Sequence, residues 1–388
     1  MSNENIERRS FLSRTVRSIA AAGLFAPIAR LTEASQSDSP TEGSRKTKLK
    51  LEHRVLGKTD LKLTTVGYGA MRTRDEAVIH RALDLGINYL DTARSYMGGQ
   101  NEVTVGNVLK KRRKEVHVAT KFAPGSVREI LDSVDTSLKC LQTDYVDVIQ
   151  AHGLSHVEAI QAPDTLEALR RLKKEGKARF IGFTTHTNQT QLLKAAVPLG
   201  VYDMILVTYN FKSSPDLTAA IEEAAKAGIG IVAMKTQAGG YSEAQMGGMS
   251  PHQASLKWVL QNKGVASTIP SMVNYDQLNE NVQAMGSKMG FLDRKTLHRY
   301  GEAIRTVYCR MCGECGGQCP FGVDVQEINR ALMYLEGYGD AELAFQAFRE
   351  IPAVAKPPVC RRCSECSVRC AHGLDLFAKM KKASSVFV

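Results

Sequence analysis

Between residues 63 and 285, short apolar runs rich in valine and isoleucine alternate eight times with longer amphipathic stretches. Runs of this kind are typical of buried strands, and the stretches between them are typical of helices. The strands are predicted at residues 64–68, 88–91, 116–120, 146–151, 178–183, 204–208, 230–234 and 266–269. Parallel strand–helix units form either a doubly wound sheet or a closed barrel. Eight even repeats without a GxGxxG turn after the first strand favour an α/β fold, a (β/α)8 TIM barrel over residues 51–290.

Cap and turn residues mark the ends of several predicted elements. The predicted helix starts are near Asp75, Asn101, Val127, Asp164, Gln189, Pro215, Pro251 and Tyr275. Asp75, Asn101 and Ser250 carry side-chain oxygens that can cap a helix amino terminus, and Ser250 precedes a proline at the first helical position. Residues 53–63, with the turn signal GKTD at 57–60, are predicted to form a hairpin that closes the amino-terminal end of the barrel.

Polar residues gather where the predicted strands end, which is where barrels of this kind carry their chemistry. Asp91 ends the second strand, Tyr96 lies in the loop after it, Lys121 ends the third strand and His152 ends the fourth. The segments DTARSY (91–96), VATK (118–121) and DVIQAHG (147–153) resemble the aldo-keto reductase family over about residues 51–285. The resemblance implies a catalytic tetrad made of these four residues.

The chemistry of carbonyl reduction accounts for each residue type in this set. The reaction needs a hydride on carbon and a proton on oxygen, and a tyrosine with its usual pKa of about 10 is a poor acid at neutral pH. We expect Tyr96 to be the general acid and Lys121 to lower its pKa. Asp91 would keep Lys121 charged, and His152 would orient the substrate oxygen. In alcohol oxidation Tyr96 would become the base.

The same resemblance implies a nicotinamide cofactor, NAD or NADP. The family segment that holds the nicotinamide amide appears here as GFTT at 182–185, so Thr184 and Thr185 are expected to bind it. The usual glutamine on the sixth strand is replaced by Leu206, and the aromatic residue after the seventh strand by Met234.

The segment expected to bind the adenine side of the nucleotide keeps Glu280 and Asn281, and it carries Ser271 in IPSM (269–272), where the family reads Ile-Pro-Lys-Ser. The lysine and arginine that pair with a 2′-phosphate in the family are replaced by other residues, which weakens the case for a strict NADPH preference. Lys235 lies in a segment that resembles a subgroup of these enzymes with a ferredoxin tail. It is either a ligand of the cofactor phosphates or an ordinary lysine at a strand end.

Eight of the nine cysteines form two CxxCxxCxxxC runs with identical spacing. The runs consist of Cys309, Cys312, Cys315 and Cys319, and of Cys360, Cys363, Cys366 and Cys370. In two-cluster ferredoxins the fourth cysteine of such a run ligates the other 4Fe–4S cluster, and Pro320 completes the bacterial form of the pattern. We therefore predict two 4Fe–4S clusters, with Cys370 completing the first and Cys319 the second.

Zinc and disulfides are the alternatives for these cysteines. Zinc sites usually place two CxxC pairs on either side of a longer loop, and disulfides require Cα atoms about 4.4–6.8 Å apart with suitable directions. Residues 291–388 are predicted to form a helical domain, with helices at 292–305, 325–336 and 340–349, that resembles an α-helical ferredoxin domain. Phe387 is expected to lie in a frayed end.

The amino terminus is predicted to be a targeting segment. RRSFL at 8–12 resembles the twin-arginine export motif, and the weakly apolar residues 19–28 are too short to span a bilayer. We expect a signal peptide over 1–34, a linker over 35–50, no transmembrane span and a periplasmic or other extracytoplasmic location. Twin-arginine export carries folded proteins, so clusters could be inserted in the reducing cytoplasm first.

These observations favour an exported oxidoreductase that exchanges hydride between a nicotinamide and a small carbonyl or alcohol, with two 4Fe–4S clusters that transfer electrons to a partner protein or stabilise the fold. Two alternatives stay open. One is an electron-transfer or scaffold subunit with an inactive barrel, and the other a nicotinamide-independent acid–base enzyme acting on a sugar-like or aromatic alcohol. The net charge of +11 is spread out, and its densest run, 110–114, contains no aromatic residue, so no nucleic-acid binding is expected.

Overall fold

The computed structural model describes residues 49–241 and 250–388. The predicted signal peptide at 1–34 and nearly all of the predicted linker at 35–50 lie outside the described residues.

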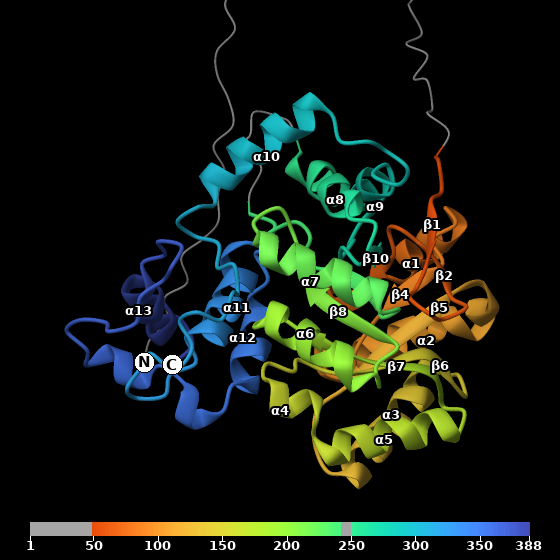
Figure 1. Ribbon diagram of the computed structural model, residues 1–388, viewed down its shortest axis with the longest axis horizontal. Helices are drawn as coiled ribbons and strands as arrows, with labels where there is room; N and C mark the ends of the chain where they lie inside the picture. Colours follow the sequence, from red (N-terminus) through yellow and green to blue (C-terminus); the bar gives the residue numbers. More distant parts are fainter. Residues whose placement is uncertain (1–48, 242–249) are drawn as a thin grey trace, which may run out of the picture. The chain divides into compact units, whose positions relative to one another are not determined.

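Eight parallel strands form one sheet, in which every strand pairs with its neighbour along the chain (Figure 1). The strands are β3 (Tyr68–Gly69), β4 (Tyr89–Asp91), β5 (His117–Phe122), β6 (Val146–Ala151), β7 (Ala178–Thr185), β8 (Met204–Thr208), β9 (Gly230–Met234) and β10 (Val265–Thr268). Parallel bridges from Val66 to Thr268 and from Gly69 to Ser271 connect the first strand region to the last. The predicted (β/α)8 barrel is therefore confirmed, as a nearly closed parallel barrel.

The first barrel strand is shorter than predicted, because part of the expected 64–68 run belongs to a hairpin. β2 (Lys62–Thr64) pairs antiparallel with β1 (His53–Val55), which confirms the predicted hairpin. The turn between them requires a glycine, since Gly57 has φ +55° and a Cβ there would lie 2.3 Å from the backbone nitrogen of Gly230.

The hairpin supplies the apolar plug at one end of the barrel interior. Leu56, Leu61 and Leu63 are fully buried and pack against inward-facing strand residues such as Val148 and Leu206. Leu206 stands where the family usually has a cofactor-binding glutamine, and here it belongs to this apolar interior. The packed interior leaves the opposite end of the barrel for polar chemistry.

Helices cover the outside of the strands (Figure 1). They are α1 (Glu76–Asp84), α2 (Gln100–Arg112), α3 (Val127–Leu141), α4 (Val157–Ile160), α5 (Pro163–Lys174), α6 (Gln189–Leu199), α7 (Pro215–Lys226), α8 (Pro251–Gln261) and α9 (Tyr275–Val282). Asp75 and Ser250 cap α1 and α8, as predicted. Asn101 does not cap α2: it is fully buried inside the helix, and its side chain donates to the carbonyl oxygen of Ala70 (2.8 Å).

The carboxy-terminal residues form a helical unit with its own apolar core. Its helices are α10 (Phe291–Ala303), α11 (Val325–Glu336), α12 (Ala341–Glu350) and α13 (Leu376–Val386) (Figure 1). Ile328 and Leu332 of α11 are fully buried in this core. The expected frayed end is wrong, because the ring of Phe387 stacks on Phe348 with centroids 4.7 Å apart. No helix in the described ranges has the length and apolar character needed to span a bilayer.

Asp147 in β6 joins the strands near their amino ends. Only 2% of its side chain is exposed, and it accepts hydrogen bonds from Arg113, Arg179 and the backbone of Val118, each at 2.8 Å. Burial alone would raise the pKa of Asp147, but His117 and Arg113 hold it well below the usual range. The carboxylate therefore stabilises the barrel.

We expect Asp147→Asn to lower the free energy of unfolding at pH 7 by about 3 kcal/mol, because it removes the buried charge that pairs with Arg113 and Arg179 and accepts from the backbone of Val118. The carboxyl pKa is depressed by folding, so its contribution is complete above the unfolded pKa of about 3.9 and is lost as pH falls through the folded pKa. Denaturant midpoints at pH 7 and pH 3 check this. The variant should lose less stability than the native chain over that interval, and equal losses would contradict the assignment.

Candidate active site

The four residues predicted as a catalytic tetrad lie at the carboxyl ends of neighbouring strands. Asp91 is the last residue of β4, Lys121 lies near the end of β5, and His152 follows β6 directly. Tyr96 begins the short 3-10 helix η2 (Tyr96–Gly99) in the loop after β4. Asp91, Tyr96 and His152 line one cavity of about 80 Å³, and Lys121 is buried against Asp91.

Asp91 and Lys121 form a buried ion pair in which each side chain is 1% exposed. The Lys121 ammonium donates to Oδ1 of Asp91 and to the carbonyl oxygen of Thr92 (2.6 Å), while Gln150 donates to Oδ2 of Asp91 (3.0 Å). Burial raises the pKa of Asp91 and lowers that of Lys121, and the attraction between the two charges opposes both shifts. The pair is a fixed, dry dipole beneath the cavity.

Tyr96 lies between this pair and His152. Its ring is edge-on to the His152 ring, with centroids 5.9 Å apart, and Nζ of Lys121 lies 4.9 Å from the Tyr96 ring centroid. Desolvation raises the pKa of Tyr96 well above its usual value, and the charge of Asp91 adds to this effect. The direction is the reverse of the one expected from the sequence, because the ammonium of Lys121 hydrogen-bonds Asp91 and Thr92. Desolvation likewise lowers the pKa of His152, which favours a neutral imidazole.

The helical unit closes the mouth of the barrel. Arg330 and Tyr334 of α11 line the same cavity as Tyr96, and so do Tyr338, which follows α11, and Gln346 of α12, whose side chain donates to the carbonyl oxygen of Ser95. The sequence reading missed these residues because it assigned residues 291–388 to a separate domain. Arg330 and Tyr334 lie four residues apart on α11, which places them on one helix face and was the available signal.

The predicted cofactor residues divide into two groups. Lys235 and Ser271 line the cavity, and Ser271, Glu280 and Asn281 line an adjoining hollow of about 200 Å³. The two spaces also share the lining residues Gln237 and Tyr338. A ligand that occupies both spaces would therefore lie along the ends of β9 and β10.

Thr184 and Thr185 are buried and line neither of these two spaces. The hydroxyl of Thr184 accepts from the backbone of Gly153 (2.8 Å), and that of Thr185 donates to the carbonyl oxygen of Thr187 (2.7 Å). The next residue, His186, does line the cavity.

The hollow contains a cation that the sequence reading missed. Arg72, from the short helix η1 (Ala70–Arg72), lines it and pairs with Asp340 (3.4 Å) while donating to the carbonyl oxygen of Tyr338 (3.1 Å). Together with the Ser271 hydroxyl and the Asn281 amide, this donor set has the chemistry needed for ribose hydroxyls and phosphate oxygens.

The first cysteine run lies around one small cavity in the helical unit. Cys309, Cys312, Cys315 and Cys370 line this cavity of about 20 Å³, so the fourth cysteine comes from the second run. None of the cysteines in the described residues forms a disulfide. Burial, together with the charges of the neighbouring thiols Cys315, Cys312 and Cys370, raises the pKa of the Cys309 thiol to about 12.

The second group of cysteines likewise includes one cysteine from the other run. Burial, together with the charges of the thiols Cys363, Cys319 and Cys366, raises the pKa of Cys360 to about 11. Cys319, the last cysteine of the first run, therefore lies with the second group. Crowded thiols that disfavour one another's ionisation are suited to a bound cation that neutralises the thiolates.

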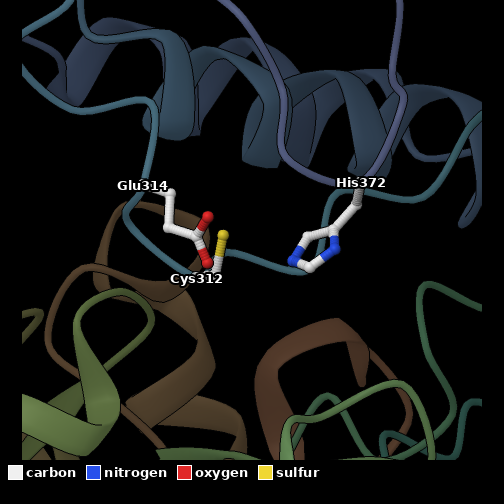
Figure 2. A group of neighbouring side chains, drawn as sticks. All are labelled: Cys312, Glu314 and His372. Carbon is white, nitrogen blue, oxygen red and sulfur yellow. The ribbon is translucent and has the colours of Figure 1, made fainter.

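Cys312 has two further potential ligands beside it. Figure 2 shows its sulfur next to the Glu314 carboxylate, with the His372 ring facing both from a separate chain segment. One ligand atom from each of the three lies within 4.8 Å of the others. This trio shares Cys312 with the cavity of four cysteines, so a single metal ion here would compete with a cluster for that sulfur.

The comparisons with known proteins concern the barrel. A model of the aldo/keto reductase family matches residues 65–247 and 241–293. L-galactose dehydrogenase of Arabidopsis thaliana is 30% identical over 296 residues, which cover 64% of this chain and 92% of that protein. Methylglyoxal reductase of Salmonella typhi is 30% identical over 249 residues, which cover 60% of this chain and 90% of that protein. The holo form of an aldo-keto reductase from Bacillus halodurans aligns with a TM-score of 0.54 and 27% identity, covering 64% of this chain and 96% of that one.

Proposed function

Because the chain belongs to the aldo/keto reductase family of NAD(P)-dependent oxidoreductases, we propose that its barrel exchanges hydride between a nicotinamide and the carbon of a small carbonyl or alcohol. The observation that carries this proposal is the convergence of Asp91, Tyr96 and His152 on one cavity, with Lys121 paired behind them. A bound nicotinamide would supply or accept the hydride.

Each side chain has a role that follows from its surroundings. Tyr96 keeps its proton near neutral pH and donates it to the substrate oxygen as negative charge develops there. The neutral imidazole of His152, edge-on to Tyr96, orients the same oxygen. The Asp91–Lys121 pair fixes positive charge near the Tyr96 ring, and a fixed dipole in a dry site needs no reorganisation during the reaction.

The nucleotide would lie in the cavity and the adjoining hollow. Ser271, Glu280 and Asn281 would contact its adenosine side, and Arg72 would meet a phosphate; one cation there is compatible with NAD or NADP. Lys235 would lie near the nicotinamide end. Thr184 and Thr185 would contact the ring only if their present hydrogen bonds were exchanged. At about 80 Å³ the cavity is smaller than typical ligand pockets of about 300–1,000 Å³. The helices α11 and α12 would therefore have to move when the nicotinamide ring enters.

The cysteine groups are proposed to hold two 4Fe–4S clusters with exchanged fourth ligands. The groups are Cys309, Cys312, Cys315 and Cys370, and Cys360, Cys363, Cys366 and Cys319. Such clusters carry single electrons, so they would either pass electrons to a redox partner protein or stabilise the helical unit, which would then resemble a ferredoxin domain. We further propose export by the twin-arginine route to the periplasm or another extracytoplasmic location, on the basis of RRSFL at 8–12.

Two other functions have specific support. The small cavity, closed by α11 and α12, favours an electron-transfer or scaffold subunit whose barrel is inactive. The internally bonded Thr184 and Thr185 and the apolar Leu206 favour acid–base chemistry on a sugar-like or aromatic alcohol without nicotinamide.

The test uses the full chain purified without oxygen. NAD and NADP are offered with L-galactose and with an aryl alcohol, NADH and NADPH with methylglyoxal, and nucleotide binding is measured in parallel. We expect binding of at least one nucleotide and turnover that depends on it. Turnover of an alcohol without nucleotide would support the acid–base alternative. The absence of both binding and turnover would contradict the proposed function.

A further inference from the structure

The active-site cavity contains a second tyrosine, supplied by the helical unit. Tyr334 of α11 is 2% exposed and lines the cavity together with Tyr96. Its hydroxyl oxygen accepts a hydrogen bond from Nζ of Lys235 (2.8 Å) and one from Nη1 of Arg330 (3.2 Å). Nζ of Lys235 also lies 4.4 Å from the centroid of the Tyr334 ring.

Two cationic donors on one phenolic oxygen favour the phenolate over the phenol. Burial alone would raise the pKa of Tyr334, but the charges and hydrogen bonds of Lys235 and Arg330 outweigh it, and the pKa is lowered. The pKa of Tyr96 in the same cavity is shifted the opposite way. One site thus holds a tyrosine that keeps its proton and a tyrosine that readily gives its proton up, which is the arrangement that separates an acid from a base.

The remaining ionisable groups around Tyr334 do not remove the difference between the pKa shifts of Tyr96 and Tyr334. Tyr338, which follows the end of α11, has a raised pKa owing to burial, and the centroid of its ring lies 5.4 Å from that of Tyr334. His152 and His186 line the cavity, and burial lowers the pKa of both. Glu350 has a pKa raised by burial.

Glu327 belongs to the same group of charges but does not contact the phenol. Nε of Arg330 donates to its carboxylate (2.7 Å), while Nη1 of Arg330 is bonded to Tyr334. Arg330 is thereby held in place from both sides. Lys235 is held too: its backbone has φ +55°, and its carbonyl oxygen accepts from the side chain of Asn210 (3.0 Å).

We propose that Tyr334 is a second catalytic residue, the base that receives through Tyr96 the proton of an alcohol whose oxygen is held by Tyr96 and His152. This inference rests on the proposed function. The substrate O–H bond breaks as a new O–H bond forms on Tyr96, while Tyr96 passes its own proton to Tyr334, and the C–H bond breaks as its hydride passes to the oxidised nicotinamide, leaving a carbonyl. In the reducing direction Tyr96 gives its proton to the substrate oxygen and takes one back from Tyr334. Lys235 and Arg330 are positioning residues.

The test compares alcohol oxidation by the full chain and by Tyr334→Phe, with NAD and NADP and the L-galactose and aryl alcohol probes. We expect kcat to fall by about 10²–10⁴-fold, the usual contribution of a positioned base. In the native chain kcat/KM should rise with pH through the lowered pKa of Tyr334 and then level off, and this rise should be absent in Tyr334→Phe. Lys235→Gln removes one cation, so the rise should move to higher pH, which a merely structural role would not cause.

A matched control is Tyr241→Phe. Tyr241 is half-buried and packs against the core of the helical unit, its hydroxyl donates to the carbonyl oxygen of Val307 (3.1 Å), and it does not line the cavity. This variant should keep the native pH profile. If the native chain oxidises the alcohol and Tyr334→Phe has the same kcat and the same pH dependence of kcat/KM, the inference is overturned. The proposed function would stay intact.

If the native chain shows no turnover, a spectrum tests the inference about Tyr334 separately from the proposed function. The ultraviolet difference between the native chain and Tyr334→Phe is recorded as a function of pH. A tyrosinate band that appears below the ordinary tyrosine pKa of about 10 supports the inference, even if the proposed function has failed. A band that appears only above that pH would overturn the inference.

Discussion

Tyr96→Phe should lower kcat by about 10²–10⁴-fold in either direction, the usual contribution of a positioned proton donor, while nucleotide binding is retained. The change removes one oxygen and keeps the ring, whose edge contacts His152 and whose face meets Lys121. Because the hydroxyl is needed when charge develops on the substrate oxygen, the loss should appear in kcat rather than in KM. Steady-state kinetics and nucleotide titration of the same preparation check this.

The control for Tyr96→Phe is a tyrosine outside the cavity. Tyr275 begins α9 and is 50% exposed, so Tyr275→Phe removes the same oxygen from the surface and should leave kcat unchanged. If Tyr96→Phe also kept the native kcat, the proton would come from another group, and the role assigned to Tyr96 would be wrong.

Cys309→Ser combined with Cys370→Ser should remove only one cluster, although the two cysteines belong to different runs. Exchanged fourth ligands put both in one site, so iron should fall from about eight to about four atoms per chain. Cys309→Ser combined with Cys319→Ser affects one ligand of each site, so iron should fall towards zero. Metal and sulfide analysis of protein purified without oxygen checks both.

Cys140→Ser is the control for this pair of variants, since Cys140 lies on α3 of the barrel and should not change the iron content. The reverse pattern, with the first combination losing all iron and the second losing half, would show that each run binds its own cluster. Zinc in place of iron and sulfide would contradict the cluster proposal. The trio of Cys312, Glu314 and His372 would then be the place to look for that ion (Figure 2).

The sequence predicted the barrel well because its signals are local. Alternating apolar runs locate β4 to β10 within a few residues, and strand ends locate Asp91, Lys121 and His152. Asn101 was misassigned because a capping amide and a buried amide look alike in sequence. Its contacts with distant groups, such as the carbonyl oxygen of Ala70, distinguish them.

The parts that sequence reasoning missed depend on contacts between distant segments. Tyr334 enters the active site because α11 packs over the barrel mouth. The spacing of Arg330 and Tyr334 marks one helix face but does not reveal what that face covers. The pKa of Tyr96 depends on where the Lys121 ammonium points, and Asp91 fixes that. Thr184 and Thr185 match a family position, but their hydroxyls are bonded to nearby backbone groups instead.

The most direct test of the account is a calorimetric titration of NADH and NADPH into the full chain, purified without oxygen. The account expects one nucleotide site per chain. Asn281→Ala and Ser271→Ala should weaken binding, while Tyr275→Phe should not. A chain that binds neither nucleotide would contradict the claim that the barrel mouth, beneath its helical wall, is a nicotinamide site.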